Sequence, residues 1–218
     1  MATELVIATR NRKKVEEIQR ILKGMLLTLY TLDDFPGCPE VEEDANTFEG
    51  NSVKKALAVA QYTGKPSIAD DSGLEVDALD GAPGVLSARY AGTGGDDRRN
   101  LEKLLSEMKD VEASKRGARF VCCIALAFPD GKVETFFGFS EGRIGAEPKG
   151  FSGFGYDPVF YPNGHHITFA EMSAAAQGQV VVSLDGSSTG GGNGAGGGGG
   201  SGGGGSGGAG GAGGGGSV

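Results

Sequence analysis

The chain has 218 residues and a formal net charge of −8 at pH 7, and every charged residue lies before residue 186. An acidic protein repels the phosphate backbone of DNA and RNA, so we expect no nucleic-acid polymer as a partner. No apolar run approaches the roughly 20 residues that a membrane-spanning helix needs, so we expect no membrane contact either.

The end of the chain differs in composition from the rest. Glycine makes up 22 of the 33 residues from 186 to 218, and the others are Ser, Ala, Thr, Asn and a final Val. A segment with almost no apolar side chains cannot offset the entropy lost on ordering. We therefore expect one folded domain over residues 1–185 and a Gly/Ser-rich disordered tail over 186–218.

The three cysteines, Cys38, Cys122 and Cys123, are an odd number, and two of them are adjacent. Adjacent residues of a strand point to opposite faces, and this spacing is neither that of a metal site nor that of a disulfide framework. Reduced thiols are typical of cytosolic proteins, and the N-terminus has no apolar signal segment. The sequence therefore predicts a cytoplasmic location.

Short apolar runs alternate with segments of helical spacing along the folded part. In chain order we expect a strand at 4–9, a helix at 10–24, a strand at 25–30, an acidic loop at 31–44, a helix at 46–64, strands at 66–70 and 74–79, a helix at 96–109, a hairpin of strands at 118–128 and 132–144, and a helix starting at 169. This order predicts an α/β fold whose mixed sheet holds both parallel and antiparallel pairs.

Capping patterns set the expected starts of three helices. Asn46 with Glu49, and Thr168 with Glu171, have the three-residue spacing of a capping box. Asp96 or Asp97 is expected to cap the helix that ends near residue 109.

The junction between the first strand and the first helix, ATRNRKK, is a candidate phosphate site. Thr9 and Asn11 supply polar side chains, the helix start supplies free N–H groups, and Lys13 and Lys14 add positive charge. No P-loop pattern occurs in the chain. The alternative is a solvated basic first turn without a ligand.

A second candidate is acidic. Glu42 and Glu43 lie in the loop before the second helix, and Asp70 and Asp71 end an apolar run, followed by Ser72. Magnesium binds carboxylates together with water and substrate phosphates, and one carboxylate could instead accept a proton from water. The alternative is that the two aspartates cap a helix or a turn.

The stretch GFSGFGYDPVF at 150–160 is a third candidate. Its glycines allow the backbone to approach a ligand, and an aromatic ring can stack on a base. A β-bulge or a barrel corner would explain the same glycines. His165 and His166 have no third ligand at metal spacing, and we assign them no role.

The stretches ATRNRKK, TFEGNSVKKA, ADDSGLEVDAL, GFGYDPVF and TFAEMS occur in one order over residues 5 to 173. This set resembles the inosine-triphosphatase-like family, the pyrophosphatases for non-standard purine nucleotides (XTP/dITP diphosphatases). The resemblance implies a bent, elongated mixed sheet with flanking helices, two lobes around a central cleft, and a homodimer. It also implies Mg²⁺-dependent hydrolysis of inosine, deoxyinosine and xanthosine triphosphates to the monophosphate and pyrophosphate.

The resemblance further implies roles for individual residues. Asp71 would be the base for the attacking water, and Glu43, Asp70 and Asp71 would line the metal site. The residues that would bind substrate are Thr9, Arg10, Asn11, Lys14, Lys55, Ser72, Phe154, Gly155, Tyr156 and Asp157, with Phe154 stacked on the purine.

The chain departs from the family pattern in two places. Arg10 replaces a glycine of the phosphate loop, which fits if its side chain points to solvent. Gln177 stands where the family has a lysine, and the Ser-His-Arg segment that reads the 6-oxo purine does not follow. Two rival hypotheses are therefore a non-catalytic nucleotide-binding or dimerisation module, and a pyrophosphatase for other modified nucleotides of the Maf-like kind.

Overall fold

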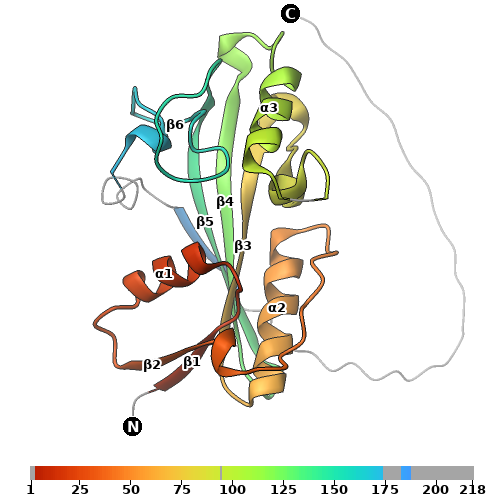
Figure 1. The fold of residues 1–218 in the computed structure, drawn as a ribbon, viewed down its shortest axis with the longest axis vertical. Helices are drawn as coiled ribbons and strands as arrows, with labels where there is room; N and C mark the ends of the chain where they lie inside the picture. Colours follow the sequence, from red (N-terminus) through yellow and green to blue (C-terminus); the bar gives the residue numbers. More distant parts are fainter. Residues whose placement is uncertain (1–2, 94, 174–182, 188–218) are drawn as a thin grey trace, which may run out of the picture.

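A mixed β-sheet runs the length of the molecule in the computed structural model, which describes residues 3–93, 95–173 and 183–187 (Figure 1). Its strands are β1 (Thr3–Ile7), β2 (Leu27–Thr31), β3 (Ser67–Val76), β4 (Gly117–Ala127), β5 (Val133–Ile144), β6 (Phe160–Pro162) and β7 (Ser183–Ser187). The strand order is β2-β1-β3-β4-β5-β6, and β7 also pairs with β5. β1 is parallel to β2 and β3, and the other pairs are antiparallel, so the predicted mixed α/β fold is confirmed.

Three α-helices accompany the described strands: α1 (Arg12–Ile21), α2 (Phe48–Thr63) and α3 (Asp97–Glu107). Asp96 caps α3 through bonds from Arg98 N and Arg99 N, as predicted. The predicted cap of α2 is wrong by one residue, because Thr47 accepts the bond from Gly50 N. The predicted final helix is only a 3₁₀ turn, Phe169–Glu171, with the expected capping box at Thr168. Met172 and Ser173 are not helical, and the residues from 174 to 182 lie outside the described part.

The prediction of two strands around the Asp-Asp-Ser-Gly stretch is also wrong. β3 is continuous through it, because all ten residues of β3 pair with β4. Gly73 makes no turn; a Cβ there would lie 2.5 Å from Ser87 Oγ and 2.6 Å from Gly84 O, so glycine is needed for a close approach. The expected second strand ends at Val76 and continues as the 3₁₀ turn Asp77–Leu79.

The connections around β1 place two helices on opposite faces of the sheet. The chain runs from β1 through α1 outward to β2, and then through α2 back past β1 to β3. Reversing direction with right-handed crossovers puts α1 and α2 on different faces, as Figure 1 shows. Parallel pairing of β1 with β3 ends at Ile7 and Ile68, where the backbone of β1 turns away towards α1. Open α/β sheets bind ligands at such a switch point.

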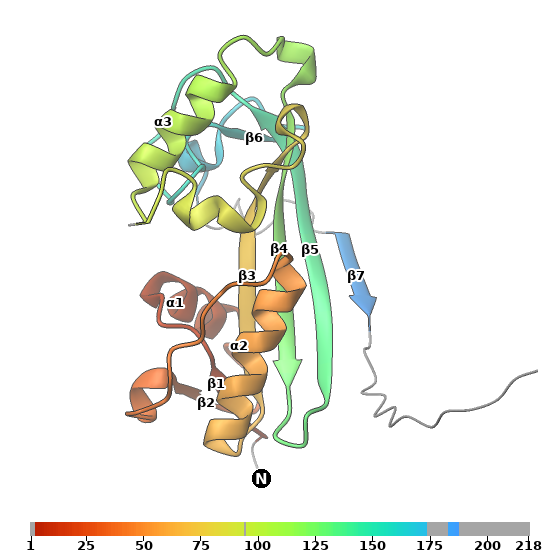
Figure 2. The ribbon, with the colours of Figure 1, turned by 90° about the vertical axis from the view of Figure 1, so that its right-hand side faces the viewer.

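The long strands β3, β4 and β5 connect two lobes (Figure 2). One lobe holds β1, β2, α1 and α2, and the other holds α3 and β6. Each lobe has its own apolar cluster, with Ala69 in the first and Leu74 in the second. Asp70, Asp71 and Ser72 therefore lie on β3 between the two cores, next to the switch point.

The cysteines of the described part are arranged as the sequence predicts. The three cysteines are unpaired. Cys123 packs against Ser52 of α2, whereas Cys122 is oriented towards Ser72 and Lys14, so the adjacent thiols lie on opposite faces as predicted. No helix in residues 3–93, 95–173 or 183–187 has both the length and the apolar content to cross a membrane.

Candidate functional site

The two adjacent aspartates of β3 point to opposite faces of the sheet. Asp70 is 8% exposed and Asp71 is 7% exposed. Asp70 contacts Lys14 of α1, and Asp71 contacts Asn51 of α2. The two carboxylates therefore flank the edge of β3 from both sides, and each has its own set of partners.

On the α1 face, a buried ion pair joins the first helix to the sheet. Lys14 Nζ lies 2.5 Å from Asp70 Oδ2, and Ser72 Oγ donates to the same oxygen at 3.1 Å. Burial alone would lower the pKa of Lys14, but the charge of Asp70 raises it above its ordinary value, so Lys14 is protonated. Asp70 Oδ1 is buried and has no hydrogen-bond partner in the described part of the chain. This oxygen is free to accept a bond from a ligand or to bind a cation.

The predicted phosphate loop, residues 8–14, offers fewer free N–H groups than the sequence suggested. Asn11 caps α1, and its Oδ1 accepts from Lys13 N at 3.0 Å and Lys14 N at 3.4 Å. Thr9 Oγ1 accepts from Asn11 N at 3.2 Å. Arg10 is exposed, but its guanidinium donates to Cys38 O at 2.8 Å instead of extending into solvent. A phosphate group at this helix start would compete with the Asn11 side chain.

On the α2 face, a lysine lies between two carboxylates. Lys55 Nζ is 2.7 Å from Glu43 Oε1 and 4.0 Å from Asp71 Oδ1. Asn51, one helical turn before Lys55, donates to Asp71 Oδ2 at 3.0 Å. Burial raises the pKa of Asp71, against the opposing effects of the Lys55 charge and the Asn51 hydrogen bond. Asp71 is therefore a partly desolvated carboxylate whose pKa is raised despite a neighbouring cation, and a raised pKa is the direction that favours proton acceptance.

Glu43 and Asp71 form a two-carboxylate set that suits Mg²⁺. Within residues 3–93, 95–173 and 183–187, no three His, Cys, Asp or Glu side chains lie close enough together to hold a metal ion. Asp70 does not join the pair, because it faces α1. Magnesium often uses only one or two protein carboxylates and takes its other ligands from phosphates and water, so a pair of carboxylates can be sufficient.

The 150–160 segment approaches the phosphate loop through one aromatic ring. Phe154 is 48% exposed, and Lys13 Nζ lies 5.4 Å from its ring centroid. Gly155 N donates to Asp97 Oδ2 of α3 at 3.1 Å. Tyr156 is instead part of the core, with its hydroxyl bonded to Ser87 O at 2.9 Å. Phe151 is also exposed, but Phe154 is the exposed ring that lies beside Lys13 of α1.

Asp157 lies near the end of this segment, and its surroundings disfavour the charged form of its carboxyl group. Its Oδ2 accepts from Phe154 N at 2.9 Å, and a Cβ on Gly153 would lie 2.1 Å from the same oxygen. Residues 151–159 are bends and turns, so the alternative of a strand bulge is wrong. Burial, helped by the charges of Glu17 and Asp97, raises the pKa of Asp157 to about 6.

Asp157→Asn should therefore stabilise the protein at neutral pH. The pKa of Asp157 is about 6 in the folded protein and near 3.8 in the unfolded chain. Protonation of Asp157 therefore stabilises the fold at low pH, and this contribution is lost as the pH rises from about 4 to 6. Above that range the buried charge costs about 3 kcal/mol. We expect a higher melting temperature for the variant than for wild type at pH 7.5 and equal values at pH 4. If the variant is no more stable than wild type at pH 7.5, the pKa of Asp157 is not raised in the folded protein.

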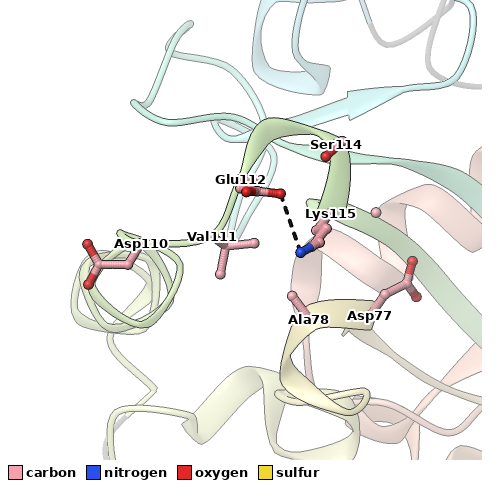
Figure 3. Close-up of a pocket in the computed structure, with 8 residues that line it drawn as sticks. Asp77, Ala78, Asp110, Val111, Glu112, Ser114 and Lys115 are labelled. Atoms are coloured by element: carbon pink, nitrogen blue, oxygen red, sulfur yellow. Dashed lines mark ion pairs between the residues drawn. The ribbon is translucent and has the colours of Figure 1, made fainter.

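A separate hollow of about 680 Å³ lies at the other end of β3 (Figure 3). Its lining includes Asp77, Asp110 and Glu112, and the single lysine there, Lys115, is 3.3 Å from Glu112. The side chains of that ion pair are 71% and 70% exposed. An open hollow with a solvated ion pair has no buried polar group to orient a ligand, and it contains none of the predicted site residues.

Sequence reasoning missed three residues that hold the site together: Asn51, Arg89 and Asp97. Arg89 Nη2 donates to Glu43 O at 2.9 Å, and Asp97 accepts from Gly155 N. Asn51 had a usable signal, because it precedes Lys55 by four residues and therefore shares its helix face. Arg89 and Asp97 are distant in sequence from their partners and carried no such signal.

The matches to known proteins include the residues of the candidate site. The model of the Ham1 family matches residues 5–181. The chain is 52% identical over 178 residues to a dITP/XTP pyrophosphatase of Geobacter sulfurreducens, which covers 82% of this chain and 89% of the relative. It is 53% identical over 169 residues to a dITP/XTP pyrophosphatase of Desulforamulus reducens, with 78% and 84% covered.

Solved structures agree with the fold. A HAM1 protein of Coxiella burnetii superposes with a TM-score of 0.76 at 38% identity and covers 82% of this chain and 91% of its own. A nucleoside-triphosphatase, named dITP/XTP pyrophosphatase, of Mycobacterium abscessus superposes with a TM-score of 0.71 at 41% identity, with 82% and 92% covered. These matches span nearly all of the described fold, and the chain belongs to the Ham1 family.

Proposed function

We propose that this chain is a Mg²⁺-dependent pyrophosphatase that hydrolyses the triphosphates of inosine, deoxyinosine and xanthosine to the monophosphate and pyrophosphate. The relatives described above are named dITP/XTP pyrophosphatases at about 50% identity over most of the chain. One observation carries the proposal: two buried carboxylates, each beside a lysine, flank the β3 edge at the switch point, close to an exposed aromatic ring.

The triphosphate would lie along the edge of β3. Lys14 and Lys55 reach this edge from opposite faces, and both are neutralised by carboxylates while no phosphate is present. Phosphate oxygens would replace those carboxylates as partners, with Thr9, Arg10, Asn11 and Ser72 as further contacts. The purine would stack on Phe154, and the backbone of Gly155, Tyr156 and Asp157 would border it.

Asp71 would act as the general base. Water attacks the α-phosphorus and its proton passes to Asp71, while the new oxygen–phosphorus bond forms. The bond from the α-phosphorus to the bridging oxygen breaks, and pyrophosphate leaves with the electron pair. Burial raises the pKa of Asp71, which favours proton acceptance, whereas a bound cation would lower it.

Glu43 and Asp71 would hold Mg²⁺, with Asp70 bordering the site from the other face through its unpaired Oδ1. A bound Mg²⁺ would supply positive charge that offsets the negative charge of the triphosphate. We further propose a homodimer in the cytoplasm, with residues 1–185 as the catalytic domain; from residue 188 onward the predicted tail lies outside the described residues. β7 pairs with β5 and ends at Ser187, two residues past that boundary.

A panel of triphosphates tests the proposal. Gln177 and the expected Ser-His-Arg position lie outside the described residues, and each missing contact to the base is worth about 1–3 kcal/mol, or one to two decades of discrimination. We therefore expect kcat/KM for inosine triphosphate to exceed that for adenosine triphosphate, and the ratio to increase when a lysine and a Ser-His-Arg segment are grafted from residue 177 onward. No turnover of any purine triphosphate would favour the non-catalytic nucleotide-binding or dimerisation module, and preference for another modified base would favour the Maf-like alternative.

A further inference from the structure

Asn51 is almost fully buried beside the proposed base, and both ends of its amide are used. It is 1% exposed. Its Oδ1 accepts from Ala45 N at 2.9 Å, and its Nδ2 donates to Asp71 Oδ2 at 3.0 Å and to Ala45 O at 3.4 Å. Because a backbone N–H can only donate, the bond from Ala45 identifies the amide oxygen and leaves Nδ2 facing the carboxylate.

Ala45 belongs to the loop that carries Glu43, and this loop has no regular secondary structure. Its position depends on a few contacts. Arg89 fixes the carbonyl of Glu43, and Asn51 fixes both backbone groups of Ala45. The loop lies so close to α2 that a Cβ on Gly50 would be 2.8 Å from Ala45 Cβ. The first turn of α2 therefore sets where the Glu43 loop lies.

We propose that Asn51 is a positioning residue, which holds Asp71 and the Glu43 loop in one arrangement so that the two carboxylates can bind a divalent cation together. This inference rests on the proposed function. Side chains that orient metal ligands commonly contribute a factor of about 10–100 to metal affinity, and the single amide of Asn51 orients one ligand directly and the other through its loop.

Binding of Mn²⁺ to the nucleotide-free protein, followed by the electron paramagnetic resonance signal of the free ion, measures this role without an activity assay. We expect Asn51→Ala to weaken Mn²⁺ binding by roughly 10–100-fold. Gly50→Ala is a second variant, which removes no polar group, although its methyl group would lie 2.8 Å from Ala45 Cβ and 3.0 Å from Thr47 Oγ1. Glycine to alanine within a helix ordinarily stabilises by about 1 kcal/mol, but here the added methyl group displaces Ala45, so we expect weaker Mn²⁺ binding as well.

Asn100 supplies a matched control on α3. It is 2% exposed, accepts from Ala91 N at 2.7 Å and donates to Ala88 O at 3.1 Å, and no carboxylate of the described residues bonds to it. Asn100→Ala should lose a similar amount of stability and keep the wild-type affinity for Mn²⁺. A purely structural role for Asn51 predicts that the two variants behave alike.

Four results would overturn the proposal: wild-type Mn²⁺ affinity in Asn51→Ala, an equal loss of affinity in Asn51→Ala and Asn100→Ala, no Mn²⁺ binding by wild type, or Mn²⁺ binding that Glu43→Gln leaves unchanged. A failure of the proposed function can be distinguished from a failure of this inference. If wild type hydrolyses no purine triphosphate while the Mn²⁺ results come out as expected, Asn51 keeps its role and only the reaction has been assigned wrongly.

Discussion

Asp71→Asn should lower kcat for inosine triphosphate by roughly 10²–10⁴-fold and change KM only a few-fold. The substitution keeps the size of the side chain and removes the charge and the basicity. The hydrogen bond from Asn51 holds the carboxylate at the β3 edge, so its place in the site does not depend on the substrate. Steady-state kinetics at saturating Mg²⁺ measure both constants.

Asp77→Asn is the control for this experiment. Asp77 follows β3 directly, but it is exposed and lies at the other end of the strand from the switch point. Its substitution should leave kcat unchanged. Turnover within a few-fold of wild type in Asp71→Asn would show that another group accepts the proton.

Lys14→Met should have two large effects, one on stability and one on binding. The Lys14 and Asp70 side chains are 22% and 10% exposed, so removing the lysine leaves a nearly buried charge without its partner. Breaking such a pair costs about 3 kcal/mol. Loss of a charged contact to phosphate should also weaken binding of inosine triphosphate by roughly 10–100-fold, with little effect on binding of inosine.

A double variant separates the two effects. Lys14→Met with Asp70→Asn removes both charges, so most of the stability should return, while triphosphate binding should stay weak. Urea unfolding and equilibrium binding of the nucleoside and the nucleotide measure the two quantities. Wild-type triphosphate affinity in the double variant, or equal losses for inosine and its triphosphate in the single variant, would mean that Lys14 only anchors α1.

Elements with their own local signals were predictable from the sequence. The Asp96 cap of α3 and the hairpin of β4 and β5 follow from capping and turn patterns. β3 was not predictable in this way, because a polar Asp-Asp-Ser-Gly stretch has low strand propensity and only its partner β4 keeps it extended. The cap of α2 was misplaced by one residue because Asn46 and Thr47 are both good caps, and only the fold selects Thr47.

The candidate site was predictable as a set of residues, but its arrangement was not. Adjacent residues of a continuous strand face opposite ways, so the split between Asp70 and Asp71 follows as soon as β3 is known to be unbroken. Arg89 lies 46 residues from Glu43 in sequence, and Asp97 lies 58 residues from Gly155. Contacts across such separations depend on how the lobes meet, which no local pattern encodes.

Hydrolysis of inosine triphosphate in ¹⁸O-labelled water with Mg²⁺ tests the central claim most directly. If water attacks the α-phosphorus, each turnover releases one pyrophosphate without label, and the label enters the phosphate of inosine monophosphate. Mass spectrometry of both products distinguishes the sites of attack. Labelled pyrophosphate, release of orthophosphate in place of pyrophosphate, or no reaction would contradict the account.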